Sequence, residues 1–432
     1  MPKITLVGAG SSAFAKNLLG DCMLTPSLAA SHMALYDIDA GRLDRSKRIL
    51  DTLNRNLGAR ADIRSYTDRT QALAGADFVI VSIAVGEYDP ILISDFEIPQ
   101  KYGLNQIFAD TVGMGGLFRA LRTVPPMIDM AREMERVCPG ALLLNYTNPM
   151  AIVTGAVQRT AGIQTVGLCH SVQVCAKDLL EGLGMPFDER VRWRIGGINH
   201  QAWLLDIRRD GEDLYPEIRR RALARPTPHP DMVRYDFMRL LGYFVTESSS
   251  HSSEYVPYYL KRQYPELTAR YGLRPDGYTR WGEGKAAHWR EMEEMVRNAS
   301  LSHVRSREYA SFIMDAVVTG TPFEIAGNVP NTGSLIGNLP TEACVEVPCL
   351  VNGNGVQPVR FGDLPPQCAA LNRTNINTQL LAMEAALTGK REHVYQAAML
   401  DPHTSAELSL DDIVSMCDEM LEFNRELLPQ FS

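Results

Sequence analysis

The sequence predicts an α/β protein, with a Rossmann-like doubly wound sheet in its first half and a mixed α+β region in its second. Short apolar runs alternate with longer helical patterns in the first half, which is typical of a parallel sheet with crossover helices. A glycine-rich turn follows the first apolar run, and the periodic pattern changes after about residue 195. The sequence therefore predicts a nucleotide-binding domain at 1–195 and an α+β domain at 196–432.

Five apolar runs predict strands, at 4–8, 33–37, 77–85, 141–145 and 165–169. Two of them, Phe78–Val81 and Ala141–Leu144, are continuously apolar, as expected for parallel strands that are buried on both faces. Helical periodicity predicts helices at 41–57 and 118–137 between the strands, and at 284–298, 305–319, 373–388 and 408–425 in the second half.

The composition excludes several classes of protein. A chain of 432 residues with 45% hydrophobic and 22% charged residues is not largely disordered, and its net charge of −8 disfavours binding to nucleic acid or to anionic membranes. Eight cysteines without a C-x-x-C pair exclude a disulfide scaffold and a zinc ribbon. The sequence shows neither a signal peptide nor an apolar run of about 18 residues. We therefore expect a cytoplasmic protein that binds neither nucleic acid nor membranes.

The first strand leads into a dinucleotide-binding pattern, Gly8-Ala9-Gly10-Ser11-Ser12-Ala13. In this pattern the first glycine forms the turn, the second lets a pyrophosphate approach, and the following helix offers free N–H groups. Asp37 ends the second strand and is a candidate ligand of the ribose hydroxyls, although it lies farther along than the usual spacing of about 20 residues. An acid there favours NAD over NADP. The alternative is a packed turn without a ligand.

Polar residues follow three later strands, where a doubly wound sheet binds its ligands. They are Asn145–Pro149, Cys169–Ser171 and Gly197–His200. A cysteine and a histidine at such a crevice are good metal ligands, but turn chemistry also explains these segments. Asp110–Gly116, before the predicted helix at 118–137, could present an acid or cap that helix. Glu247–Tyr255 concentrates donors and acceptors, and an exposed polar loop is the alternative.

Seven motifs spread over nearly the whole chain together resemble glycoside hydrolase family 4. They are Gly8–Ser11, Asn145–Pro149, Cys169–Val172, Gly197–His200, Tyr243–Ser249, Thr374–Asn377 and Asp401–Thr404. This family is an exception to the two-carboxylate mechanism of most glycosidases. The resemblance implies a sheet of the lactate/malate dehydrogenase type, NAD and a divalent metal (Mn²⁺) as cofactors, and a homodimer or homotetramer.

The resemblance also implies a substrate class. Cys169-His170-Ser171-Val172 is similar to the form found in melibiase-type α-galactosidases of the family. The phospho-glycosidase branch carries a basic residue in the loop after the third strand, whereas residues 86–99 contain neither Lys nor Arg. A sugar phosphate needs a cationic partner, so we expect an unphosphorylated α-galactoside. An α-glucosidase or α-galacturonidase is the alternative within the family, and an NAD-dependent hydroxy-acid dehydrogenase is the alternative outside it.

The family's reaction oxidises the sugar at C3, removes the C2 proton and eliminates the aglycone. By resemblance, Cys169 and His200 hold the metal, although the softness of a thiolate alone would favour zinc, iron or cobalt. Tyr255 falls at the position of the family's tyrosine base. A phenol needs a nearby cation to act as a base, and Arg280 is a candidate neighbour at the substrate site.

Two further assignments follow from the resemblance. Asn148 matches a substrate-binding asparagine. The phospho-α-glucosidase branch has an aspartate directly after the metal-binding cysteine, where this chain has His170. This departure leaves two candidates for the general acid, His170 first and Asp110 second.

Overall fold

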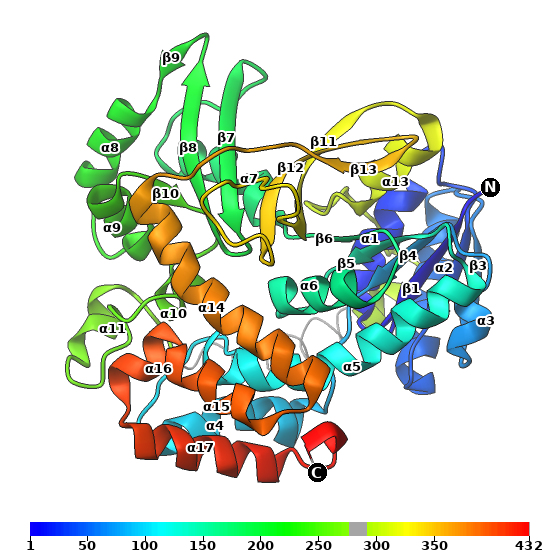
Figure 1. Cartoon of the computed structure of the whole chain (residues 1–432). Coiled ribbons are helices and arrows are strands. Elements are labelled where there is room, and N and C mark those ends of the chain that lie inside the picture. The colour runs from blue at the N-terminus through cyan, green and yellow to red at the C-terminus, as the bar shows by residue number, and fades with distance from the viewer. Residues whose placement is uncertain (276–291, 432) are drawn as a thin grey trace.

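The computed structural model describes residues 1–275 and 292–431 (Figure 1). Within them the strands are β1 (Lys3–Val7), β2 (His32–Tyr36), β3 (Asp62–Tyr66), β4 (Phe78–Val81), β5 (Leu142–Asn145), β6 (Thr165–Gly167), β7 (Val191–Ile198), β8 (Gln201–Arg209), β9 (Glu212–Asp213), β10 (Phe244–Val245), β11 (Phe323–Pro330), β12 (Cys344–Asn352) and β13 (Gly355–Pro358). They form one sheet in the order β10-β8-β7-β12-β11-β6-β5-β4-β1-β2-β3, with β13 beside β12 and β9 beside β8.

The first six strands form the parallel part of the sheet. Their order, β3-β2-β1-β4-β5-β6, is that of a dinucleotide-binding doubly wound fold, and each neighbouring pair is parallel. The other strands continue the sheet in antiparallel fashion beyond β6, beginning with the pair Asn328↔Gly167 between β11 and β6. The predicted fold class is therefore confirmed. The strand order reverses between β1 and β4, so the ligand crevice is expected at their carboxyl ends.

The helices cover both faces of the sheet. They are α1 (Ser12–Met23), α2 (Ala40–Asn56), α3 (Arg69–Leu73), α4 (Ile93–Lys101), α5 (Gly113–Val137), α6 (Met150–Thr160), α7 (His170–Gly182), α8 (Tyr215–Ala224), α9 (Met232–Leu241), α10 (Ser249–Glu254), α11 (Glu266–Arg270), α13 (Ala310–Thr319), α14 (Pro366–Thr388), α15 (Arg391–Leu400), α16 (Pro402–Glu407) and α17 (Leu410–Phe423). Single turns lie at Tyr88–Leu92 and Pro429–Phe431. The long α14 runs from the antiparallel strands toward α5, with α15–α17 beyond it (Figure 1).

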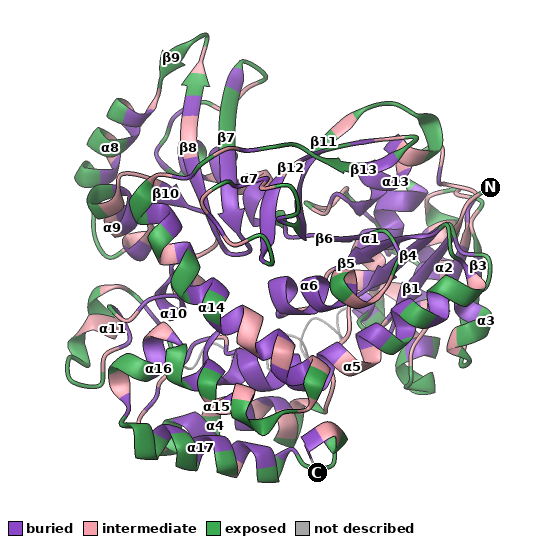
Figure 2. Ribbon diagram, in the orientation of Figure 1, coloured by how far each residue is buried: buried purple, intermediate pink, exposed green. Residues whose placement is uncertain are grey.

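Buried residues fill the strands of the sheet and the helix faces packed on it (Figure 2). The two large hydrophobic cores among them both join the first half of the chain to the second. Val79 and Leu117 are buried in one core together with Leu421 of α17. The other core brings Leu6 of β1 together with Ile376 of α14. Residue 195, the expected domain boundary, lies within β7. The division into 1–195 and 196–432 stays a prediction, and the two parts share one sheet and both cores.

Several elements differ from the predicted ones. Strand β3 was not predicted, because it is an edge strand in which Ile63 is the one buried residue. Helix α5 begins at Gly113 rather than 118, since Gly115 and Gly116 let its first turn lie directly against Ala109 and Thr111. Helix α13 begins at residue 310 rather than 305.

The part 284–291 of the predicted helix 284–298 lies outside the described residues. The described part of the chain contains no helix that is both long and apolar enough to cross a membrane.

Candidate active site

The glycine turn after β1 is built to let another chain segment approach closely. Gly8 has φ +87°, a left-handed conformation, and a Cβ there would lie 2.0 Å from the Ser82 carbonyl oxygen. The Gly10 N–H donates to Oδ2 of Asp37 over 2.7 Å, and a Cβ on Gly10 would collide with that carboxylate. The turn and Asp37 therefore meet at the carboxyl end of β1 and β2, where a dinucleotide would place its pyrophosphate and ribose.

The two serines after the turn have different surroundings. Ser11 is exposed, precedes α1 and makes no side-chain capping hydrogen bond to it, so the first N–H groups of α1 are available to an anion. Ser12 is fully buried, and its hydroxyl bonds to that of Ser46 in α2. Because this hydroxyl is buried and already bonded, Ser12 would contact a dinucleotide through its backbone N–H only.

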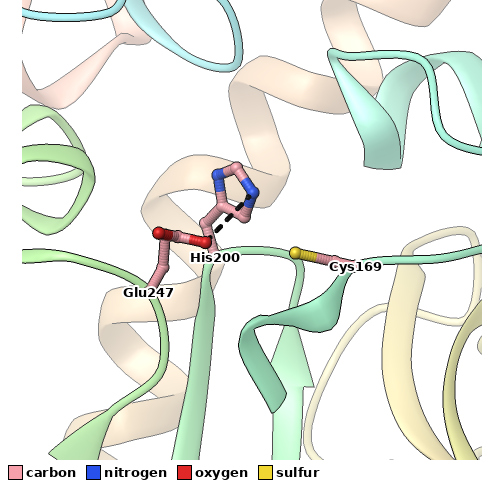
Figure 3. A group of neighbouring side chains, drawn as sticks. All are labelled: Cys169, His200 and Glu247. Atoms are coloured by element: carbon pink, nitrogen blue, oxygen red, sulfur yellow. Dashed lines mark ion pairs between the residues drawn. The ribbon is translucent and has the colours of Figure 1, made fainter. Parts of the chain in front are cut away.

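Cys169, His200 and Glu247 bring one sulfur, one nitrogen and one oxygen within 4.8 Å of one another (Figure 3). Cys169 directly precedes α7, His200 lies in the turn between β7 and β8, and Glu247 follows β10. The Nε2 atom of His200 is 3.8 Å from Oε2 of Glu247. A thiol, an imidazole and a carboxylate converging from three separate segments are a suitable donor set for a divalent transition metal.

Two of these three residues have unusual backbones. His200 and Glu247 both have φ +62°, a left-handed conformation that costs free energy for residues other than glycine. Among the residues that the structure describes, Nδ1 of the buried His200 ring has no hydrogen-bond partner. Such strain and such an unpaired polar atom are concentrated at functional sites, so the residues fit a bound cation.

The electrostatics of the cluster also fit a cation. Burial raises the pKa of the Cys169 thiol well above its ordinary value, and the carboxyl groups of Glu346 and Glu247 raise it further. Burial lowers the pKa of His200 to about 4, an effect strengthened by His251, so the imidazole is neutral. For Glu247, burial opposes ionisation, but His251, His200 and the Ser248 N–H together bring the pKa of the carboxyl down to about 2. A metal ion would displace the thiol proton and bind all three.

Asp110 and Asn148 lie beside this cluster. The Asn148 amide donates to Oδ2 of Asp110 over 3.2 Å, and Nε2 of His251 is 3.8 Å from Oδ1. The guanidinium of Arg119, itself buried, lies 3.9 Å from Oδ2. Burial opposes ionisation of Asp110, yet His251, Arg119 and His200 bring its pKa below the ordinary value. Asp110 is therefore an anion held against polar partners.

Tyr255 is fully buried one residue after α10. Its hydroxyl donates to the Asn199 carbonyl over 3.1 Å, and the centres of its ring and of the His200 ring are 6.4 Å apart. Burial raises the pKa of the phenol well above its usual range, and the carboxylates of Asp110 and Glu254 add to this. Arg280, the predicted cationic neighbour, lies outside the described residues.

His170 begins α7, directly after Cys169, and is half exposed. Its Nδ1 is 3.7 Å from Oε1 of Glu308. The structure thus brings six of the predicted residues to one place, with His170 at the open side. They are Asp110, Asn148, Cys169, His170, His200 and Tyr255.

Glu247 and His251 are site residues that had no predicted role. Glu247 completes the donor set, and His251 lies between Asp110 and Glu247, with its Nδ1 3.7 Å from the Glu247 carboxylate. The signal was the polar run Glu247–Tyr255, which a buried site explains and an exposed loop does not.

A glycine turn and a donor cluster at the same edge of the sheet define a class: Rossmann-type α/β proteins with a candidate cation site at the nucleotide crevice. The model of the "Family 4 glycosyl hydrolase" matches residues 3–185, and that of the family's C-terminal domain matches residues 195–404. The chain belongs to glycosyl hydrolase family 4, which confirms the resemblance in its sequence.

Individual relatives are similar to this chain over its full length. The chain is 54% identical to an alpha-galactosidase of Bacillus subtilis, with 100% of both chains covered. It is 34% identical to an alpha-galactosidase of Rhizobium meliloti, covering 100% of this chain and 90% of that one. A solved 6-phospho-alpha-glucosidase from gut microorganisms, in complex with NAD and Mn²⁺, is 22% identical, with a TM-score of 0.83 and 100% of both chains covered. At 22% identity, this last similarity shows a shared fold.

Proposed function

We propose that this chain is an α-galactosidase that hydrolyses unphosphorylated α-galactosides with NAD and Mn²⁺ as cofactors. One observation carries the proposal: Cys169, His200 and Glu247 converge beside Tyr255 at the crevice of a dinucleotide-type sheet. A hydrolase that used two carboxylates alone would need neither this thiol nor the glycine turn. The full-length similarity to an α-galactosidase supports the choice of sugar.

The residues of the chain divide the binding tasks. Gly8, Gly10 and the N-terminus of α1 hold the pyrophosphate of NAD, and Asp37 holds the ribose. Cys169 and His200, with Glu247, hold the metal. When bound, these groups supply a hydride acceptor at C3 of the sugar and a Lewis acid beside it.

Tyr255 is the base that takes the proton from C2 of the sugar. As a buried phenol among carboxylates it keeps its own proton. The positive charge of a metal ion held by Cys169, His200 and Glu247 would lower the pKa of the phenol and so favour the phenolate. Asn148 orients the ring hydroxyls. His170 is at the open side, where an aglycone leaves, and is the first candidate for the general acid. Asp110, held by Asn148, is the second, because its lowered pKa leaves it ionised and it would have to take up a proton before it could donate one.

The preference for an unphosphorylated sugar rests on the segment 86–99. This segment includes the turn Tyr88–Leu92 and most of α4, and it contains neither Lys nor Arg. A phosphate group on the substrate would therefore find no cationic side chain there.

The decisive experiment follows the release of p-nitrophenol from its α-galactoside by protein stripped of metal and nucleotide. Activity is expected only when NAD and Mn²⁺ are both restored, without net formation of NADH. Deuterium from the solvent should enter C2 of the galactose product. Unchanged activity without both cofactors would refute the mechanism, and one NADH per product would indicate a dehydrogenase. Faster turnover of the α-glucoside or α-galacturonide would change the assigned substrate.

We further propose that the enzyme acts in the cytoplasm as a homodimer or homotetramer. The eight cysteines are free and buried, and Cys169 must remain a thiol to bind metal. The homodimer or homotetramer is what the resemblance to family 4 implies. Light scattering coupled to size exclusion gives the number of subunits.

A further inference from the structure

Glu254, the last residue of α10, binds a loop that is distant in the sequence. A single oxygen of its buried carboxylate accepts hydrogen bonds from three consecutive backbone N–H groups. These are Ile107 at 2.7 Å, Phe108 at 3.1 Å and Ala109 at 3.2 Å. Successive N–H groups that converge in this way form a concave binding site for an anion. The Glu254 carboxylate fills that site from within the chain.

The loop that Glu254 holds ends at an active-site residue. Ala109 has φ +48°, a left-handed conformation that needs support from its surroundings. The next residue is Asp110, which bonds to Asn148 and faces His251. The residue after Glu254 is Tyr255, whose carbonyl oxygen accepts from the Asn375 amide over 3.1 Å. One carboxylate thus connects the segments that carry Asp110 and Tyr255.

We propose that Glu254 is a positioning residue, which fixes Asp110 in relation to Tyr255 for the reaction. This inference rests on the proposed function and deepens it. Without the carboxylate, three N–H groups in a buried place lose their acceptor, and the left-handed conformation of Ala109 loses its support. Asp110 then moves with the loop, although the hydrogen bonds of Glu254 go to Ile107–Ala109 and to neither the nucleotide turn nor the metal-binding cluster.

The test compares three variants with the wild-type protein. In Glu254→Leu the acceptor is removed. In Glu254→Gln an oxygen remains that can accept the same three bonds. Glu133→Leu is the matched control, because Glu133 is also a buried carboxylate, bound by Arg69 and Thr70 near the C-terminal end of α5, the end away from the site. Thermal unfolding shows that each variant is folded.

Glu254→Leu should lower kcat by about 100-fold, Glu254→Gln by less than about 10-fold, and neither should change KM or the Kd for NAD by more than about 3-fold. Hydrogen exchange of the amides of residues 107–109 should be faster in Glu254→Leu and normal in Glu133→Leu. The inference is overturned if exchange at 107–109 is unchanged, or if Glu133→Leu lowers kcat as much. An inactive wild type would refute the proposed function, whereas an active wild type with an equally active Glu254→Leu would refute this inference alone.

Discussion

At the scale of single residues, Cys169 differs from the other seven cysteines by its surroundings rather than by its burial. All eight are free and buried, but the sulfur of Cys169 faces His200 and Glu247. Cys169→Ser should weaken Mn²⁺ binding by at least about 100-fold, since loss of outer-shell partners alone costs about 10–100-fold. Cys175→Ser, in the same helix α7 and near Arg234, is the control and should bind Mn²⁺ normally. Calorimetry measures both, and equal affinities would contradict the ligand role of Cys169.

We expect the buried carboxyl of Glu346 to make the free energy of unfolding depend on pH. Burial raises the pKa of this carboxyl to about 8. One oxygen accepts from the Asn328 amide over 3.1 Å, and the other has no hydrogen-bond partner in the described part of the chain. The metal-free folded state keeps this proton up to about pH 8, whereas the unfolded chain releases it near pH 4.5. The free energy of unfolding should therefore fall, on the order of a few kcal/mol, as the pH rises through this window.

Glu346→Gln should remove this fall, because the amide stays neutral at every pH. The comparison is made by urea unfolding of metal-free protein between pH 5 and 9. Glu324→Gln, an exposed residue on the neighbouring strand β11, serves as the control and should keep the wild-type profile. Parallel profiles for Glu346→Gln and the wild type would show that Glu346 is ionised throughout.

The motifs in the sequence, read through the resemblance to family 4, identified most of the site residues but left Glu247 and His251 without a role. Cys169 and His200 were predicted as metal ligands by the resemblance to family 4, and their places two residues after β6 and β7 agree with that assignment. Glu247 and His251 were not assigned, since a run of serines and charged residues looks the same in an exposed loop and in a buried one. Their role becomes visible only when three distant segments meet.

At the scale of elements, the first turn of α5 depends on the absence of side chains. A Cβ on Gly115 would lie 2.5 Å from both Cβ and the carbonyl oxygen of Ala109. Gly115→Ala should therefore destabilise the protein by about 1–3 kcal/mol and displace the loop that carries Asp110, with a loss of kcat. Gly182→Ala, at the C-terminal end of α7, should instead be neutral or stabilise by up to about 1 kcal/mol, because the added Cβ would have no atom of the described residues within 4 Å. Denaturant unfolding of both variants measures the change in the free energy of unfolding and so tests both predictions.

The same contact explains why the sequence misplaced the start of α5. Three glycines in Gly113–Gly116 indicate a flexible turn when read locally, because glycine is a poor helix former. The helix begins there because packing against Ala109 and Thr111 outweighs that preference. The buried strands β4 and β5 were predicted since their continuous apolar runs carry the signal within themselves, whereas the edge strand β3 has a single buried residue.

At the scale of the whole molecule, the candidate site depends on the continuity of the sheet. Cys169 follows the last parallel strand, whereas His200 and Glu247 belong to the antiparallel extension. The two parts are joined through β11 and β12, which lie between β6 and β7. A donor set formed in this way exists only when both halves of the chain are folded together.

The division at residue 195 therefore has a testable consequence. A fragment of residues 1–195 would lose the C-terminal helices that bury Val79 and Leu117, and it would end within β7. Because its remaining core would be open on that face, we expect the fragment to aggregate or to bind the dye ANS, without a cooperative thermal transition. The full chain should unfold in one transition, and its midpoint should rise with Mn²⁺, since a ligand at about 100 times its Kd adds about 2.7 kcal/mol. A soluble fragment that unfolds cooperatively and binds NAD would instead establish residues 1–195 as an independent domain.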